Sequence, residues 1–235
     1  MSSETTALIG TGLYTLREAA GITGVPSASI KRWLYGYKYR RDSGFREQPP
    51  IWQGDLGRIH GRTILSFLDL MEARFIHAFR GHRLRWVAIR EAAKIACEMF
   101  EDQHPFTRGK FRTDGIRIFR QVEEGEKVRL FDLNRKSWVF KDIVEPSLYR
   151  GVEFSDDQIS RWYPLFPHKS IVIDPEICFG RPLAARGYVP TDILAEAFET
   201  EEGNEAAVAK WYDVPVSAVR ASVKFEALRK DRLHA

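Results

Sequence analysis

Two short helical patterns between residues 15 and 34 are separated by only three residues, and this spacing narrows the possible folds more than any other feature. Thr15 followed by Glu18 forms a capping box, so a helix is expected to begin there. Gly24 is expected to end that helix. A second helix is expected from Ser27, with an apolar face of Ile30, Trp33 and Leu34. Two short helices joined by a glycine-containing turn are typical of a helix-turn-helix.

The outer face of the second helix is polar and basic. Short hydroxyl side chains can approach base edges, and Lys and Arg can contact phosphates. The stretch from Lys31 to Arg46 holds six basic residues and one acid, Asp42, so it favours contact with a polyanion. A solvated loop whose tyrosines cover a small core is the alternative interpretation. The predicted DNA-binding residues are Ser27, Ser29, Lys31, Arg32, Lys38, Arg40, Arg41 and Arg58.

A loop and a wing are expected to follow the second helix. Tyr35–Gln48 is interpreted as a basic loop with interspersed tyrosines. Ile51–Gln53 and Gly57–His60 are interpreted as two short strands joined at Gly54-Asp55, where a winged helix carries its wing. Helix, basic loop and wing would then adjoin one another, which favours a DNA-binding role.

The middle of the chain is expected to be helical and then to form hairpins. A helix from Ser66, with Asp69 as its capping acid, is apolar nearly all round, so it is either a dimerisation element or the central helix of the core. A longer helix is expected over Leu84–Glu101. Antiparallel hairpins are expected around Asp114-Gly115 and across 134–137, and an irregular connector over 146–170.

The tail combines a strand at Ile171–Ile173 with a helix near Thr191 and two further short helices, Glu205–Trp211 and Val216–Leu228. These last two helices repeat the N-terminal pair at an offset of 189 residues, with Val214-Pro215 matching Val25-Pro26. A second helix-turn-helix is therefore proposed, and acidic neighbours favour packing or partner binding over DNA contact. Its candidate surface residues are Ser217, Arg220 and Lys224.

The fold class expected from these patterns is mainly α with small antiparallel β hairpins, an α+β chain. An N-terminal winged helix-turn-helix over 12–64 precedes a middle region of helices and hairpins over 65–145. The 146–170 connector then leads to a helix-turn-helix-like domain over 171–230.

Motifs for catalysis and metal binding are missing from the sequence, so we expect a binding protein and not an enzyme. The chain has no phosphate-binding glycine loop, nucleophile elbow, His-Glu-x-x-His or CxxC, and no cofactor or metal site is expected. Cys97 and Cys178 are expected to be reduced thiols, and the scattered histidines to be structural. Without a membrane span or an apolar leader, a cytoplasmic location is expected.

Charge is distributed unevenly along the chain. Residues 1–120 hold 20 basic and 12 acidic residues, a net charge of +8, whereas residues 121–235 hold 16 and 20, a net charge of −4. A chance imbalance is common for halves of this size. The asymmetry nevertheless fits a front that meets a polyanion and a back that meets a different partner.

Three stretches resemble known families. Tyr14–Ala20, Gly24–Pro26 and Ile30–Trp33 resemble the MerR-type winged helix-turn-helix. In the middle, Asp69–Ile76, His104–Phe106 and Thr113–Gly115 are similar to the corresponding region of the larger VapB-type antitoxins. Ile173–Pro182 and Arg186–Thr191 resemble a small antitoxin domain of unknown function that is commonly encoded beside a PIN-like ribonuclease toxin, although Phe179 stands where that domain has a small residue.

The resemblance implies an antitoxin of a type II toxin-antitoxin system. Such a protein binds its own operator as a dimer, represses its operon and masks a ribonuclease toxin. On this interpretation the basic front binds duplex DNA and the acidic back faces the toxin. The alternatives are a MerR-like transcriptional regulator that responds to a ligand or a protein partner without a toxin, and an architectural DNA bender with two helix-turn-helix units.

Overall fold

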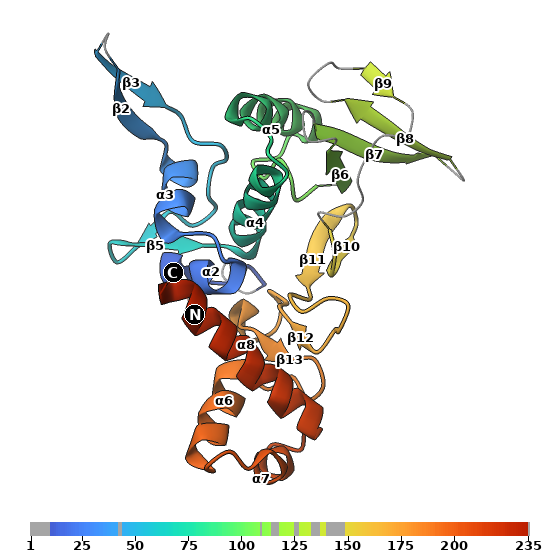
Figure 1. Ribbon diagram of the computed structural model, residues 1–235. Helices are drawn as coiled ribbons and strands as arrows, with labels where there is room; N and C mark the ends of the chain where they lie inside the picture. Colours follow the sequence, from blue (N-terminus) through green and yellow to red (C-terminus); the bar gives the residue numbers. More distant parts are fainter. Residues whose placement is uncertain are drawn as a thin grey trace, which may run out of the picture.

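The computed structural model describes residues 10–41, 44–108, 110–113, 118–124, 127–132, 137–139 and 149–234. These residues form an α+β fold in which helices alternate with small antiparallel sheets, so the predicted fold class is confirmed. Within the described residues, no helix is long and apolar enough to cross a membrane. Figure 1 shows an elongated arrangement with the β2–β3 hairpin at one end and helices α6 and α7 at the other.

The two N-terminal helices form where the sequence predicts them. Thr15 and Glu18 make the expected capping box at the start of α2 (Leu16–Thr23), and Gly24 ends this helix in a left-handed conformation with φ of 76°. Helix α3 (Ser27–Tyr35) follows and buries Ile30, Trp33 and Leu34, as its apolar spacing predicts.

A three-stranded antiparallel sheet, ordered β1-β5-β4, flanks these helices. Its strands are β1 (Tyr14–Thr15), β4 (Arg58–Ile59) and β5 (Arg62–Leu65). The predicted strand at 51–53 is wrong, because these residues form a bend in which the Ile51 N–H donates to the Trp33 backbone oxygen and not to a partner strand. The hairpin lies slightly later and turns at His60-Gly61.

The expected basic loop over 35–48 is instead a hairpin. Strand β2 (Tyr37–Arg41) pairs antiparallel with β3 (Gly44–Gln48), and Tyr39 lies opposite Arg46. The alternation of tyrosine with Lys38 and Arg40 has the period of two that a strand requires, so the pattern was present in the sequence but was interpreted as a charged loop. This hairpin projects from the end of α3 (Figure 1).

Helix α4 (Phe67–Gly81) is the central helix of the core, with Ser66 and Asp69 forming a capping box at its start. Its fully buried apolar side chains include Phe67, Leu70, Met71, Phe75, Ile76 and Phe79. Of the two interpretations of this helix, the structure therefore supports the core helix. Helix α5 (Trp86–Phe100) packs beside it through Ile89, Ala92 and Ala96.

The middle region continues as a four-stranded antiparallel sheet, ordered β6-β7-β8-β9, in agreement with the predicted hairpins. Its strands are β6 (Lys110–Thr113), β7 (Ile118–Glu124), β8 (Lys127–Asp132) and β9 (Ser137–Val139). The turn predicted at Asp114-Gly115 lies outside the described residues. The connector is not irregular as predicted, because β10 (Val152–Ser155) and β11 (Gln158–Trp162) form a hairpin whose residue Trp162 is buried.

The tail begins with the paired strands β12 (Ile171–Val172) and β13 (Leu183–Ala184), between which lies the short 3₁₀ turn η2 (Cys178–Gly180). Helices α6 (Thr191–Thr200), α7 (Glu205–Trp211) and α8 (Val216–His234) follow. The α6 and α7 starts agree with prediction, whereas α8 is longer than expected. A small apolar cluster, including Leu194, Val208 and Val219, holds them together. Both cysteines are free thiols.

The end of the tail packs directly on the N-terminal helices. Arg232 of α8 donates hydrogen bonds to the backbone oxygens of Gly21 (3.2 Å) and Ile22 (2.6 Å) in α2. The Tyr14 hydroxyl donates to the Gly180 oxygen at 2.8 Å. Segments more than 160 residues apart therefore share one packed interface, and α8 runs from α2 to the far end of the molecule (Figure 1).

Candidate nucleic-acid interface

Helix α3 exposes the residues expected to contact DNA. Its apolar side faces the core, which leaves the side chains of Lys31 and Arg32 exposed. Ser27 and Ser29 are half-buried. The Ser27 hydroxyl donates a hydrogen bond to the Leu16 backbone oxygen at 3.1 Å, so part of its hydrogen-bonding capacity joins α3 to α2.

A basic hollow of about 490 Å³ lies between α2, α3 and the β4–β5 hairpin. Arg58 stacks on the ring of Tyr35, with 5.6 Å between the guanidinium carbon and the ring centroid. The Tyr35 hydroxyl lies 3.2 Å from the Thr63 hydroxyl, which ties the hairpin to the end of α3. The residues that line the hollow include four cations and no acid: Thr15, Leu16, Arg17, Lys31, Arg58, Gly61, Arg62 and Thr63.

Five exposed cations therefore form one surface, which we call the basic face: Arg17, Lys31, Arg32, Arg58 and Arg62. Arg17 and Arg62 were not among the residues predicted from the sequence. They are separated in sequence from Lys31 and belong to α2 and β5, so only the fold brings them beside α3. A surface of one charge sign with little local acid is what a phosphate backbone requires.

The β2–β3 hairpin extends this surface. Lys38 and Arg40 of β2 and Arg46 of β3 are all exposed, and Arg32 of α3 lies over the Tyr37 ring at 5.7 Å. Arg41 ends β2 opposite Gly44. Phe45 is 79% exposed, so the hairpin also presents an apolar side chain to solvent.

The residues predicted as a second surface lie on α8, in the tail. Ser217, Arg220 and Lys224 are all exposed. Arg220 makes a bidentate ion pair with Glu205 at 3.0 and 2.6 Å, which neutralises its charge locally. The structure does not bring these three residues next to the basic face, because the first half of α8 lies toward α6 and α7 (Figure 1).

A buried polar cluster lies behind the segment 49–57, which links the β2–β3 hairpin to β4. Asp69 of α4 accepts hydrogen bonds from the Trp52 indole at 2.7 Å and from the backbone N–H of Ser66 at 3.0 Å. His104 Nε2 lies 3.2 Å from Asp69 Oδ1 and 3.5 Å from Asp55 Oδ2. Burial opposes protonation of His104, but the hydrogen bond to Asp69 and the neighbouring carboxylates outweigh it and raise its pKa to about 9.

Glu72 lies one turn further along α4 and is fully buried. Its Oε1 accepts hydrogen bonds from the backbone N–H groups of Phe106 (2.6 Å) and Thr107 (3.0 Å). Burial raises the pKa of Glu72 to about 8, despite the opposing effects of His104 and these hydrogen bonds. No sequence signal distinguished Glu72 from a surface acid.

Replacing Glu72 by glutamine is expected to make the protein less sensitive to alkaline pH. The folded chain retains a proton on Glu72 that the unfolded chain loses near its ordinary pKa, so stability falls as pH rises from about 5 to 8, by up to about 1.4 kcal/mol per pH unit. Urea unfolding of wild type and Glu72→Gln at pH 5.5 and 7.5, in metal-free buffer, measures this. His104 titrates in both proteins and its pKa is raised by Glu72, so the difference between them reports Glu72 together with its electrostatic coupling to His104. Glu98→Gln, on the exposed side of α5, is the control, and equal pH dependence in all three proteins would contradict the prediction.

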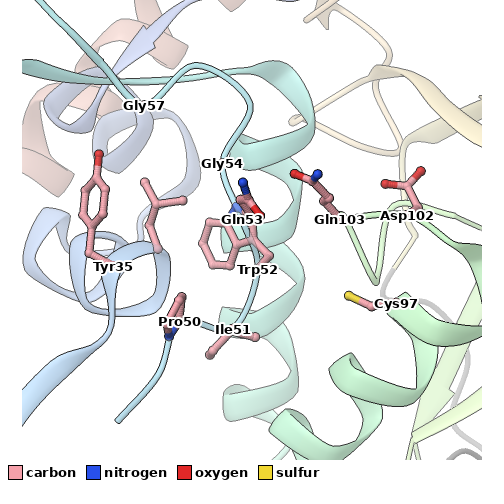
Figure 2. Close-up of a pocket in the computed structure, with 11 residues that line it drawn as sticks. Tyr35, Pro50, Ile51, Trp52, Gln53, Gly54, Gly57, Cys97, Asp102 and Gln103 are labelled. Carbon is pink, nitrogen blue, oxygen red and sulfur yellow. The ribbon is translucent and has the colours of Figure 1, made fainter. Parts of the chain in front are cut away.

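A cavity of about 500 Å³ lies between the segment 49–57 and the end of α5 (Figure 2). Pro50, Ile51 and Trp52 line one side, and Cys97 and Asp102 lie across from them. Its lining is predominantly apolar, and Leu34 and Tyr35 at the end of α3 also contribute to it. The cavity therefore touches the helix that carries Lys31 and Arg32.

Comparison with known proteins yields a distant relative and a similar solved structure. No protein-family model matches this chain. A Mycobacterium tuberculosis protein named "Putative antitoxin VapB45" is 28% identical over 183 residues, which cover 73% of this chain and 76% of that protein. The X-ray crystal structure of Rv2018 from Mycobacterium tuberculosis has a TM-score of 0.62 at 21% identity, covering 92% of this chain and 98% of that one. This second likeness shows the fold alone.

Proposed function

We propose that this chain is a VapB-type antitoxin that binds the operator of its own operon and neutralises a PIN-like ribonuclease toxin. Its distant relationship to a protein named as an antitoxin supports the antitoxin role. It acts by binding partners and not by catalysis. It binds DNA as a homodimer, because one small module alone contacts too little of the duplex. The domain bounds proposed from the sequence, 12–64, 65–145, 146–170 and 171–230, belong to this proposal.

The basic face carries the DNA-binding half of the proposal. In a MerR-like winged helix-turn-helix, α3 enters the major groove and the β4–β5 hairpin acts as the wing. Lys31, Arg32 and Arg58 then meet phosphates, while Ser29 is placed to approach a base edge. Lys38, Arg40 and Arg41 on the β2–β3 hairpin extend the contact along the duplex.

The tail carries the toxin-binding half. Its exposed acids lie on and around α6 and α7, and a ribonuclease that binds RNA needs a basic cleft, so the charges are complementary. Large apolar side chains are exposed in the same region, with Trp211 at 65% and Tyr188 at 51%. Exposed aromatic residues surrounded by charge are typical of protein interfaces.

The decisive experiment uses the full chain with its own upstream DNA and with the product of the neighbouring reading frame. We expect the chain to bind the upstream duplex with strong salt dependence and to co-purify with that product. Absence of DNA binding at low salt would overturn the operator half. DNA binding without capture or inhibition of the neighbouring product would overturn the antitoxin half.

Two serine variants separate base contact from helix packing. Ser29→Ala is expected to change sequence preference among operator variants more than overall affinity, because its hydroxyl can reach a base edge. Ser27→Ala is expected to lower the free energy of unfolding by about 0.5–1.5 kcal/mol, because the hydrogen bond to Leu16 is lost. Binding to a panel of operator variants and urea unfolding measure the two effects. The assignment fails if Ser29→Ala affects all duplexes equally.

The cavity in Figure 2 favours a second function, a MerR-like regulator that responds to a small ligand without a toxin. Its volume and apolar lining suit a small molecule, and it adjoins α3. A ligand there would change DNA affinity only if it bound the DNA-competent state differently from other states. A neighbouring gene without ribonuclease activity would favour this function over the antitoxin.

A further inference from the structure

We infer that Asp55, Asp69 and His104 form a binding site for a divalent transition-metal ion, for which Zn²⁺ is the probe. The three residues come from three segments: the loop before β4, the first turn of α4 and the turn after α5. Sequence spacing predicted no metal site because these donors are 14 and 35 residues apart, outside any local ligand motif. The site is independent of the proposed function.

The donor atoms are spaced as ligands of one ion. Zn²⁺ binds histidine nitrogen and carboxylate oxygen at about 2.0–2.2 Å, so two ligands of the same ion lie about 3.0–3.5 Å apart. His104 Nε2 lies 3.2 Å from Asp69 Oδ1 and 3.5 Å from Asp55 Oδ2, and the three ligand atoms lie within 4.8 Å of one another. Only small side-chain movements are needed to admit an ion between them.

Neighbouring groups orient these ligands. Trp52 and the Ser66 N–H hold the two oxygens of Asp69. His104 Nδ1 lies 3.6 Å from Asp102 Oδ1, and Asp102 is itself held by Arg108 at 2.7 Å. A carboxylate behind a ligating histidine is a common feature of zinc sites, and Asp102 would need to approach Nδ1 by a few tenths of an ångström to hydrogen-bond the ring.

Burial and solvent access also suit an ion. Asp69 and His104 are buried, with 0% and 2% exposure, whereas the side chain of Asp55 is 33% exposed. The exposed side leaves room for water ligands and for entry of the ion. One imidazole nitrogen can donate only one proton, so Nε2 cannot donate to both carboxylates at full strength. An ion would instead contact all three donors at once.

An unpartnered oxygen atom beside the cluster also supports a cation site. Glu72 Oε2 is buried and has no hydrogen-bond partner among the described residues. A buried carboxyl oxygen without a partner is costly, and a cation beside it would lower that cost by favouring the ionised form of Glu72. Two oxygen donors and one imidazole suit borderline ions such as Zn²⁺, whereas Mg²⁺ and Ca²⁺ favour oxygen ligands alone.

The test uses the full chain, freed of metal with EDTA and then dialysed. Calorimetric titration with Zn²⁺ is expected to show one site per chain, and Co²⁺ is expected to give visible absorption bands of a nitrogen- and oxygen-ligated ion. Zn²⁺ should also raise the unfolding temperature. Asp55→Asn is expected to weaken Zn²⁺ affinity at least tenfold while the metal-free protein stays folded, since Asp55 lies at the surface.

Two control variants guard against adventitious binding. Asp157→Asn and His60→Gln remove an exposed acid and an exposed histidine that are not among the three ligands, and both should leave the affinity unchanged. His104→Gln should abolish binding, and the Asp55 variant carries the test if that protein does not fold. Absence of stoichiometric binding, or equal affinity in Asp55→Asn and Asp157→Asn, would overturn the proposal and leave His104 as a protonated ion-pair residue.

Discussion

Replacing Gly180 by alanine is expected to lower the free energy of unfolding by about 3–6 kcal/mol. Gly180 is buried with φ of 78°, a conformation that costs alanine about 1–2 kcal/mol. An added Cβ would overlap the Tyr14 hydroxyl and come within 3.2 Å of Gly12 Cα. Forced repacking adds about 1–3 kcal/mol, and the displaced hydrogen bond from Tyr14 adds about 1 kcal/mol.

Gly61→Ala is the matched control for this variant. Gly61 has nearly the same φ, 75°, but no atom lies within 4 Å of its Cβ position. It therefore carries the backbone cost without the collision, and a loss of about 1–2 kcal/mol is expected. Urea unfolding of both variants measures the difference. Equal losses would show that the contact between Gly180 and Tyr14 contributes nothing to stability.

The double variant Lys31→Ala/Arg32→Ala is expected to weaken operator binding strongly and to flatten its salt dependence. Each phosphate contact contributes about 0.9 to the slope of log K against log salt, so each bound copy should lose about 1.8 from the slope. For each bound copy, the same relation gives an affinity loss of about 30-fold at 0.15 M salt and about 200-fold at 0.05 M salt. Fluorescence anisotropy over a salt series measures both quantities.

Arg220→Ala/Lys224→Ala controls for total charge. It removes the same two positive charges from α8, where Arg220 is paired with Glu205. We expect its salt slope to match that of wild type, which also tests whether the second helical pair touches DNA. If both double variants lowered the slope equally, the effect would come from net charge or from DNA contact by both helical pairs, and the assignment of DNA contact to α3 alone would fail.

Local sequence signals predicted the helices well. The capping boxes at Thr15 and Ser66 mark the starts of α2 and α4, and Gly24 marks the end of α2, because each of these residues satisfies backbone groups within its own turn. The hairpins of the middle region were likewise predicted from alternation and turn residues. Features set by neighbours in sequence are the ones a sequence can reveal.

Features set by distant contacts were predicted poorly. No strand forms at 51–53, where Trp52 is buried in the core and its indole N–H donates to Asp69 of α4. The β2–β3 hairpin was missed because its alternating residues are charged or aromatic and bury no apolar face that would mark a strand. The β10–β11 hairpin was not predicted, because the sequence between its strands has no clear turn signal.

The candidate sites divide in the same way. Lys31 and Arg32 could be chosen from the sequence because they share one helix face, and their role stays a prediction. Arg17 and Arg62 reach the same hollow from other elements, which only the tertiary fold shows. The group of Asp55, Asp69 and His104 likewise assembles from separate segments.

Because α8 docks on α2, cleavage within α8 would also affect the N-terminal helices. Arg232 donates hydrogen bonds to the carbonyl oxygens of Gly21 and Ile22. A protease that removed the last two turns of α8 would therefore expose α2, the helix on which α3 packs. A cleavage outside the DNA-contacting surface would thus loosen that surface. Turnover that starts at the carboxyl end would disable both proposed activities together, without a separate degradation signal for each.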